Sequence, residues 1–167
     1  MTIMLIRIAS LLSAFALLGG AQAHAQLAPI KQSVAPSAAD GLASQSIQAE
    51  LTGNHEKALQ LANDAIKADP KNPWGHYDGG DALESLKRID DAVSAFRQAE
   101  QYFSDADVWG KSVAIWGQAN VFRQLGRCQD AVPIYERYAT FVEKLDPDAA
   151  ALARTYEKSC GPSSKSH

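Results

Sequence analysis

The chain has 167 residues, of which 46% are hydrophobic, and carries 16 Lys and Arg against 19 Asp and Glu, a formal net charge of −3. This slightly acidic balance leaves no basic stripe of the kind that holds nucleic acid or anionic lipid, so the sequence argues against both classes of partner. The length is that of one domain with a sizeable core.

The N-terminus has the order of a secretory signal peptide. One basic residue, Arg7, precedes an apolar run over residues 8–20, and a string of small residues follows. We predict a signal peptide over residues 1–25 with cleavage after Ala25; cleavage after Ala23 is the alternative. A retained membrane anchor would need about 20 apolar residues, more than this run provides. The mature chain would be periplasmic or secreted, with no membrane insertion once the signal is removed.

The rest of the chain divides into a leader, a helical region and a tail. Residues 26–37 contain two prolines and no periodicity, which predicts a flexible leader, and residues 161–167 predict a flexible tail. Between them the sequence is rich in Ala, Leu, Gln, Glu and Lys, without the alternation typical of strands. We therefore predict one all-α domain over residues 38–160.

The helical region repeats itself. Ala58 and Ala92 are 34 positions apart, and so are Gly53 and Lys87. A third copy is displaced by five residues, because Ala92 and Ala131 are 39 apart. We assign the extra residues to the segment 104–112, which predicts a lengthened helix there. A 34-residue period that joins two helices is the tetratricopeptide spacing.

Small and aromatic residues in the copies carry a resemblance to a known family. The second copy has small residues at Gly80, Ala92 and Ala99 and an aromatic residue at Phe96, and the third has Ala131 and Tyr135 in the matching places. In these positions the chain resembles the tetratricopeptide repeat (TPR) family. The resemblance implies an α-solenoid of three helix pairs, with repeats at about 39–72, 73–106 and 107–146 and a capping helix over 147–160.

The resemblance also implies where a ligand would bind, because TPR proteins as a family hold peptides or protein segments on the concave wall made by the first helix of each pair. The implied groove residues are Asp40, Ala43, Ile47, Glu50 and Leu51 in repeat one, Trp74, Tyr77, Asp81, Glu84 and Ser85 in repeat two, and Val113, Trp116, Asn120, Arg123 and Gln124 in repeat three. Tyr, Trp and Arg are the types that dominate binding energy at interfaces.

We expect Tyr77, Trp116, Asn120 and Arg123 to hold a protein segment, within an assembly of the cell envelope. The carboxylates at the N-terminal end of the groove favour a basic or neutral peptide over an acidic one. The alternative for Trp74 and Trp116 is that both pack between helices.

Two cysteines follow the signal peptide, and export would place them where disulfides persist. Cys128 is predicted in the turn between the helices of repeat three. The chain then runs up to about Asp146 and back down the capping helix, which returns Cys160 to the level of Cys128. This topology predicts a structural disulfide, with two separate thiols as the alternative.

No pattern points to catalysis, a metal or a cofactor. His55, His76 and His167 share no helical face with one another or with a cysteine, and no nucleophile elbow, zinc motif or P-loop occurs. The glycines of the sequence DGGD at 78–81 are explained by close helix packing. We expect a monomeric or weakly associating binding domain rather than an enzyme. A structural subunit that extends an oligomer, or an enzyme without a local motif, are the alternatives.

Overall fold

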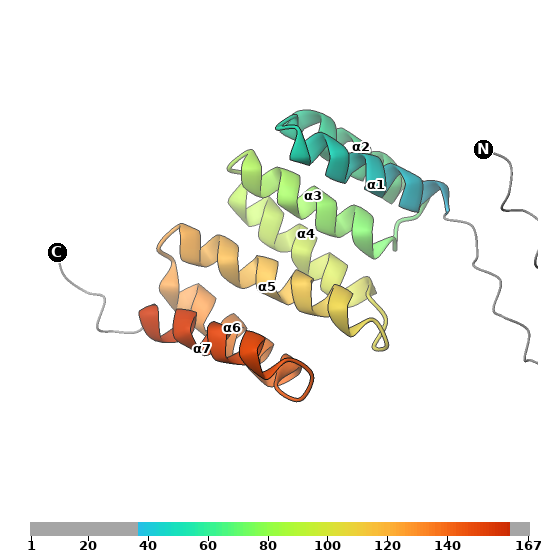
Figure 1. Cartoon of the computed structure of the whole chain (residues 1–167). Helices are drawn as coiled ribbons and strands as arrows, with labels where there is room; N and C mark the ends of the chain where they lie inside the picture. Colours follow the sequence, from blue (N-terminus) through green and yellow to red (C-terminus); the bar gives the residue numbers. More distant parts are fainter. Residues whose placement is uncertain (1–36, 161–167) are drawn as a thin grey trace, which may run out of the picture. The chain divides into compact units, whose positions relative to one another are not determined.

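The computed structural model describes residues 37–160 (Figure 1), and this part of the chain is all-helical, as predicted, with seven helices and no strand. The predicted signal peptide, all but the last residue of the leader, and the tail lie outside the described residues. None of the described helices is long and apolar enough to cross a membrane. The helices are α1 (Ala38–Leu51), α2 (His55–Ala68), α3 (Pro73–Ser85), α4 (Ile89–Tyr102), α5 (Val108–Gln124), α6 (Cys128–Val142) and α7 (Pro147–Ser159).

Short polar side chains begin five of these helices. Each accepts a hydrogen bond from the backbone N–H three residues further on, which satisfies one of the free donors of the first turn. The capping residues are Ser37, Asn54, Asn72, Asp107 and Asp146. At the start of α1, the Asp40 carboxylate also accepts from the backbone N–H of Ser37, which completes a capping box.

Three of the turns between consecutive helices use the same backbone conformation. A residue with positive φ lies in each: Gly53 at 76° between α1 and α2, Lys87 at 62° between α3 and α4, and Gly126 at 69° between α5 and α6. Glycine adopts this conformation at little cost, whereas Lys87 does not. The three turns therefore share one geometry, which two of them reach with glycine and the third with lysine.

Consecutive helices pack against one another along the whole described chain, and α3 also contacts both α1 and α5. Figure 1 shows the resulting stack, with the odd-numbered helices along one side. No contact of similar extent joins α2 to α4 or α4 to α6. The odd-numbered helices of the pairs thus approach each other more closely than the even-numbered ones, an arrangement compatible with an α-solenoid.

Small residues let the helices approach, and aromatic side chains fill the space between them. Ala58, Ala92 and Ala131 on the even-numbered helices are fully buried. Ser46, 34 positions before Gly80, is also buried, and its hydroxyl donates to the Ala58 carbonyl over 2.8 Å. A residue without a long side chain is therefore needed where the two helices of a pair cross.

The fifth and sixth helices differ from the others in ways that the sequence partly anticipates. α5 has 17 residues against 13 in α3, which confirms the predicted lengthening, and it begins just after Asp107. Pro133 predicts that its own helix starts near Asp130 or is kinked. The observed helix, α6, starts at Cys128, two residues before Asp130, and continues through Pro133. The missing N–H of Pro133 leaves one backbone carbonyl in the first turn without its helical donor.

The predicted cysteine pair is present. Cys128 at the start of α6 and Cys160 at the end of α7 lie with their Cα atoms 4.9 Å apart and their sulfurs at disulfide distance. The two residues enclose 31 others, and α7 packs against α6. The antiparallel return of α7 is what brings Cys160 back to the level of Cys128.

Candidate functional site

The implied groove residues of α3 share one face of that helix because of their spacing. Positions three, four and seven apart share one face of a helix, so Trp74, Tyr77, Asp81 and Glu84 follow one face of α3. All four side chains are half-buried. The contact of α3 with both α1 and α5 brings side chains of three helices together on this face.

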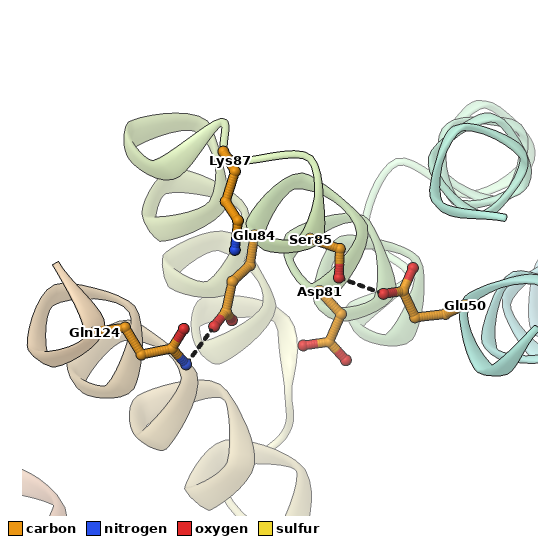
Figure 2. A pocket seen from close by; sticks show the side chains of 6 residues that line it. All are labelled: Glu50, Asp81, Glu84, Ser85, Lys87 and Gln124. Carbon is orange, nitrogen blue, oxygen red and sulfur yellow. Dashed lines mark hydrogen bonds between the residues drawn. The ribbon is translucent and has the colours of Figure 1, made fainter. Parts of the chain in front are cut away.

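A pocket of about 380 Å³ lies at the C-terminal ends of α1, α3 and α5. We call it the acidic pocket, because carboxylates supply half of its lining. Figure 2 shows these side chains around a shared space. The lining residues are Glu50, Asp81, Glu84, Ser85, Lys87 and Gln124. Lys87 contributes the single positive charge among these six side chains.

Hydrogen bonds hold two of the three carboxylates in place. Ser85 Oγ donates to Glu50 Oε1 over 2.5 Å, and His55 Nδ1 lies 2.9 Å from the same oxygen. Gln124 Nε2 donates to Glu84 Oε1 over 2.7 Å, which links α5 to α3. The other oxygen of Glu50, Oε2, is buried and has no hydrogen-bond partner among the described residues.

Asp81 is the exception, since its carboxylate makes no hydrogen bond with any described residue. In Figure 2 it lies between Glu50 and Glu84 with no interaction drawn to it. Burial and, to a smaller extent, the negative charges of Glu84 and Glu50 together raise the pKa of Asp81 to about 7. Burial also raises the pKa of Glu84, while the hydrogen bond from Gln124 and the charge of Lys87 oppose that rise.

A second acid lies deeper in the same helix. Asp78 is only 3% exposed, and its Oδ2 atom has no hydrogen-bond partner among the described residues. Burial, as the larger cause, and the negative charge of Asp81, one turn along α3, together raise the pKa of Asp78 to about 8. Acidic groups without a positive partner therefore lie both in the pocket, at Asp81, and in the interior beneath it, at Asp78.

An aromatic cluster occupies the N-terminal end of α3. Trp74 makes edge-to-face contacts with Phe103 and Tyr77, with ring centroids 4.8 and 5.8 Å apart. Tyr77 also contacts Phe96, at 5.5 Å between ring centroids. Both predicted groove residues thus pack between helices, and both are half-buried. Trp109, which the groove prediction missed, lies 5.2 Å from Trp74 and is 66% exposed.

Trp116 packs against three tyrosines. Its ring centroid lies 5.5 Å from Tyr135, 5.1 Å from Tyr138 and 5.5 Å from Tyr156, so side chains of α6 and α7 hold it. Trp116 therefore packs largely between helices, which was the alternative to a role in ligand binding. A smaller pocket of about 210 Å³ opens beside it, and we call it the apolar pocket. It is lined by Val113, Trp116, Tyr138, Ala149 and Leu152.

Asn120 and Arg123 are bound to each other and to neighbours. Arg123 donates from Nη2 to Asn120 Oδ1 over 2.9 Å and from Nε to the Tyr135 hydroxyl over 3.1 Å. Its guanidinium also lies 4.7 Å above the Tyr156 ring. Arg123 thus joins α5 to α6 and α7, and Asn120 holds the guanidinium from within α5.

Of the predicted groove residues, the structure places Asp81 and Glu84 in the acidic pocket, together with Glu50, Ser85 and Gln124. Asp40 instead belongs to the cap of α1 and accepts a hydrogen bond from Asn72 over 2.8 Å, and Ala43 is buried. Lys87, His55 and the α7 residues Ala149 and Leu152 lie at the two pockets but were not among the predicted groove residues. The alignment of Lys87 with Gly53 was the one signal available for Lys87.

No group of three or more His, Cys, Asp and Glu side chains in the described part of the chain is arranged to hold a metal ion. No protein-family model matches the sequence, and comparison with curated proteins gives no significant match.

Proposed function

We propose that this chain is an exported three-repeat TPR domain, closed by α7 as its capping helix, that binds a basic segment of a partner protein in an assembly of the cell envelope. The helix boundaries support the repeat assignment, since α3 starts at Pro73 and α7 at Pro147, where the second repeat and the cap are expected. The shared turn conformation at Gly53, Lys87 and Gly126 supports it as well.

The observation that carries the proposed ligand class is the carboxylate of Asp81. It faces a pocket, it makes no hydrogen bond within the described chain, and Glu50 and Glu84 flank it. Bringing a positive charge next to such a group lowers the free energy of its ionised form. An arginine side chain suits this place best, because its planar guanidinium can donate to two carboxylates at once.

The test is a titration of the ¹⁵N-labelled protein, followed by amide chemical shifts, with two short peptides. One is acetyl-Ala-Arg-Ala-amide, and the other has Glu in place of Arg. We expect the Arg peptide to shift the amides around Asp81 and Glu84 in a saturable way, and the Glu peptide to leave them unchanged. Shifts are suited to this measurement because a single ion pair gives weak affinity.

The matched control separates the pocket from general attraction to an acidic protein. The variant Asp81→Asn/Glu84→Gln removes two charges from the pocket. The variant Glu56→Gln/Glu136→Gln removes two exposed charges from α2 and α6. We expect the first variant to lose the saturable shifts and the second to keep them. Equal binding by both variants, or equal shifts with the Glu peptide, would contradict the proposal.

Catalysis in the same pocket is the second candidate, because a carboxyl group with a pKa near 7 can exchange a proton at neutral pH. The lining adds carboxylates, an amide and an ammonium group, and the hydroxyl of Ser85 is engaged with Glu50. A panel of p-nitrophenyl glycosides and esters tests this alternative. Turnover that disappears in the Asp81→Asn variant would favour an enzyme.

A further inference from the structure

A second pocket on the face of the odd-numbered helices extends what the acidic pocket can recognise. The apolar pocket lies where α5, α6 and α7 meet, and its five lining residues carry no formal charge. Trp116 forms a rigid wall, because Tyr138 and Tyr156 pack against its ring. Leu152 remains 47% exposed at the opposite wall. An apolar side chain of a partner would bury both.

The two pockets share α5. Trp116 lines the apolar pocket and Gln124 the acidic one, eight residues further along the same helix. Eight residues correspond to about 12 Å along the helix axis. The pockets also extend to opposite sides of α5, toward α7 and toward α3, and neighbouring helices lie about 8–10 Å apart. Together these offsets separate the pocket centres by roughly 15–20 Å.

An extended peptide covers this separation with a definite spacing. A strand rises about 3.3 Å per residue, so six residues span about 20 Å. Alternate side chains of a strand point to the same side, so two side chains that both face the protein must be an even number of positions apart. A spacing of six positions meets both conditions.

We infer that the partner segment is an extended peptide that places a basic side chain in the acidic pocket and a large apolar side chain, six positions away, in the apolar pocket. This inference rests on the proposed function. Charge complementarity decides which side chain enters which pocket. One pocket has three carboxylates and a single ammonium group, so it suits the basic side chain, and the lining of the other pocket is uncharged. The reverse placement would bury a charge against Trp116 and Leu152.

The test uses the purified protein to select from a displayed library of random twelve-residue peptides. We expect enriched peptides to carry Arg or Lys at one position and Leu, Met or Phe six positions away. The enriched peptide is then synthesised with a fluorescent label, and its affinity is measured by anisotropy. Versions with the two residues two or ten positions apart should bind at least tenfold more weakly, since each can fill only one pocket.

Variants assign each end of the peptide to its pocket. Leu152→Ser should weaken binding of the selected peptide about tenfold, and should have no effect once the apolar residue of the peptide is replaced by Ser. Leu145→Ser is the matched control, because Leu145 is 66% exposed and lies outside both pockets. Asp81→Asn should act only on peptides that keep the basic residue.

The outcomes separate this inference from the proposed function. Peptides that share a basic residue, but no apolar residue at a fixed spacing, would overturn the two-pocket inference and leave the proposed function standing. Finding a second copy of the chain, or its own leader, in the apolar pocket would likewise overturn the two-pocket inference and leave the proposed function standing. Selection of peptides without a basic residue would overturn both.

Discussion

The backbone of Gly80 on α3 lies directly against the ring of Phe96 on α4. A Cβ atom at position 80 would lie 2.7 Å from Cε1 of this ring, which is completely buried. The same ring also lies against Gly117 on α5, where a Cβ would lie 3.0 Å from Cδ1 and Cε1 of Phe96. One phenylalanine is thus enclosed by glycines of the helices before and after it, and these contacts join three helices.

Replacing Gly80 by alanine should therefore destabilise the protein. The added methyl group must displace the Phe96 ring, and overpacking of this kind costs about 1–3 kcal/mol. Urea unfolding measures the change. Gly41→Ala is the matched control, because Gly41 lies in α1 and a Cβ added there would meet no neighbouring atom within 4 Å. We expect Gly41→Ala to stabilise by about 0.5–1 kcal/mol, since alanine is the better helix former. Equal effects of the two substitutions would contradict this account.

The turn between α3 and α4 offers a stabilising substitution. Lys87 holds a φ of 62°, which costs a residue with a side chain about 1–2 kcal/mol. Lys87→Gly should raise the free energy of unfolding by about 1 kcal/mol. Gly126→Ala is the reverse control: position 126 has the same kind of φ and open space around it, so the change should destabilise through the backbone alone. Stability lost in Lys87→Gly would mean that the Lys87 side chain contributes more than its backbone costs.

The two carboxyl groups with the most strongly raised pKa values, Asp78 and Asp81, should make the protein less stable as the pH rises. The pKa of Asp78 is about 8 and that of Asp81 about 7 in the folded protein, against about 3.9 when unfolded. Folding then takes up protons between about pH 4 and pH 8. The unfolding free energy falls over this interval by up to about 1.4 kcal/mol per pH unit for each group.

Asp78→Asn isolates this effect, because an amide does not ionise. Relative to the unmodified protein, the variant should gain stability from pH 5 to pH 8, as measured by urea unfolding at both values. Glu56→Gln, on the exposed face of α2, controls for the loss of one charge. A variant whose stability changes with pH in parallel with the unmodified protein would show that Asp78 ionises normally.

Reduction of the cysteine pair should loosen the C-terminal helix. A bond between Cys128 and Cys160 closes a loop with 31 residues between them, which stabilises by about 3–4 kcal/mol in the chain-entropy model. Adding dithiothreitol should therefore lower the urea midpoint. Cys160→Ser should start at the lower midpoint and not respond to the reductant. Hydrogen exchange should accelerate first in α7, whose main helix contact is α6.

Much of the fold follows from local features of the sequence. Capping residues and prolines mark where α3 and α7 begin, and the 34-residue spacing of small residues predicts helices that pack in pairs. The proximity of Cys128 and Cys160 follows from counting helix lengths up and down. These features depend on residues that are near one another in sequence or on the length of the chain between them, so they can be predicted from composition and period.

The candidate site depended on the tertiary structure. Glu50, Asp81 and Gln124 come from three different helices, and only the crossing of those helices and the side-chain rotamers decide that they line one pocket. Helical period places Trp116 and Arg123 on one face of α5, yet it could not show that α7 supplies the aromatic ring, Tyr156, that contacts both. Local pattern determines which helices form. How deeply each side chain is buried, and which charges face each other without a partner, is decided where helices distant in sequence meet.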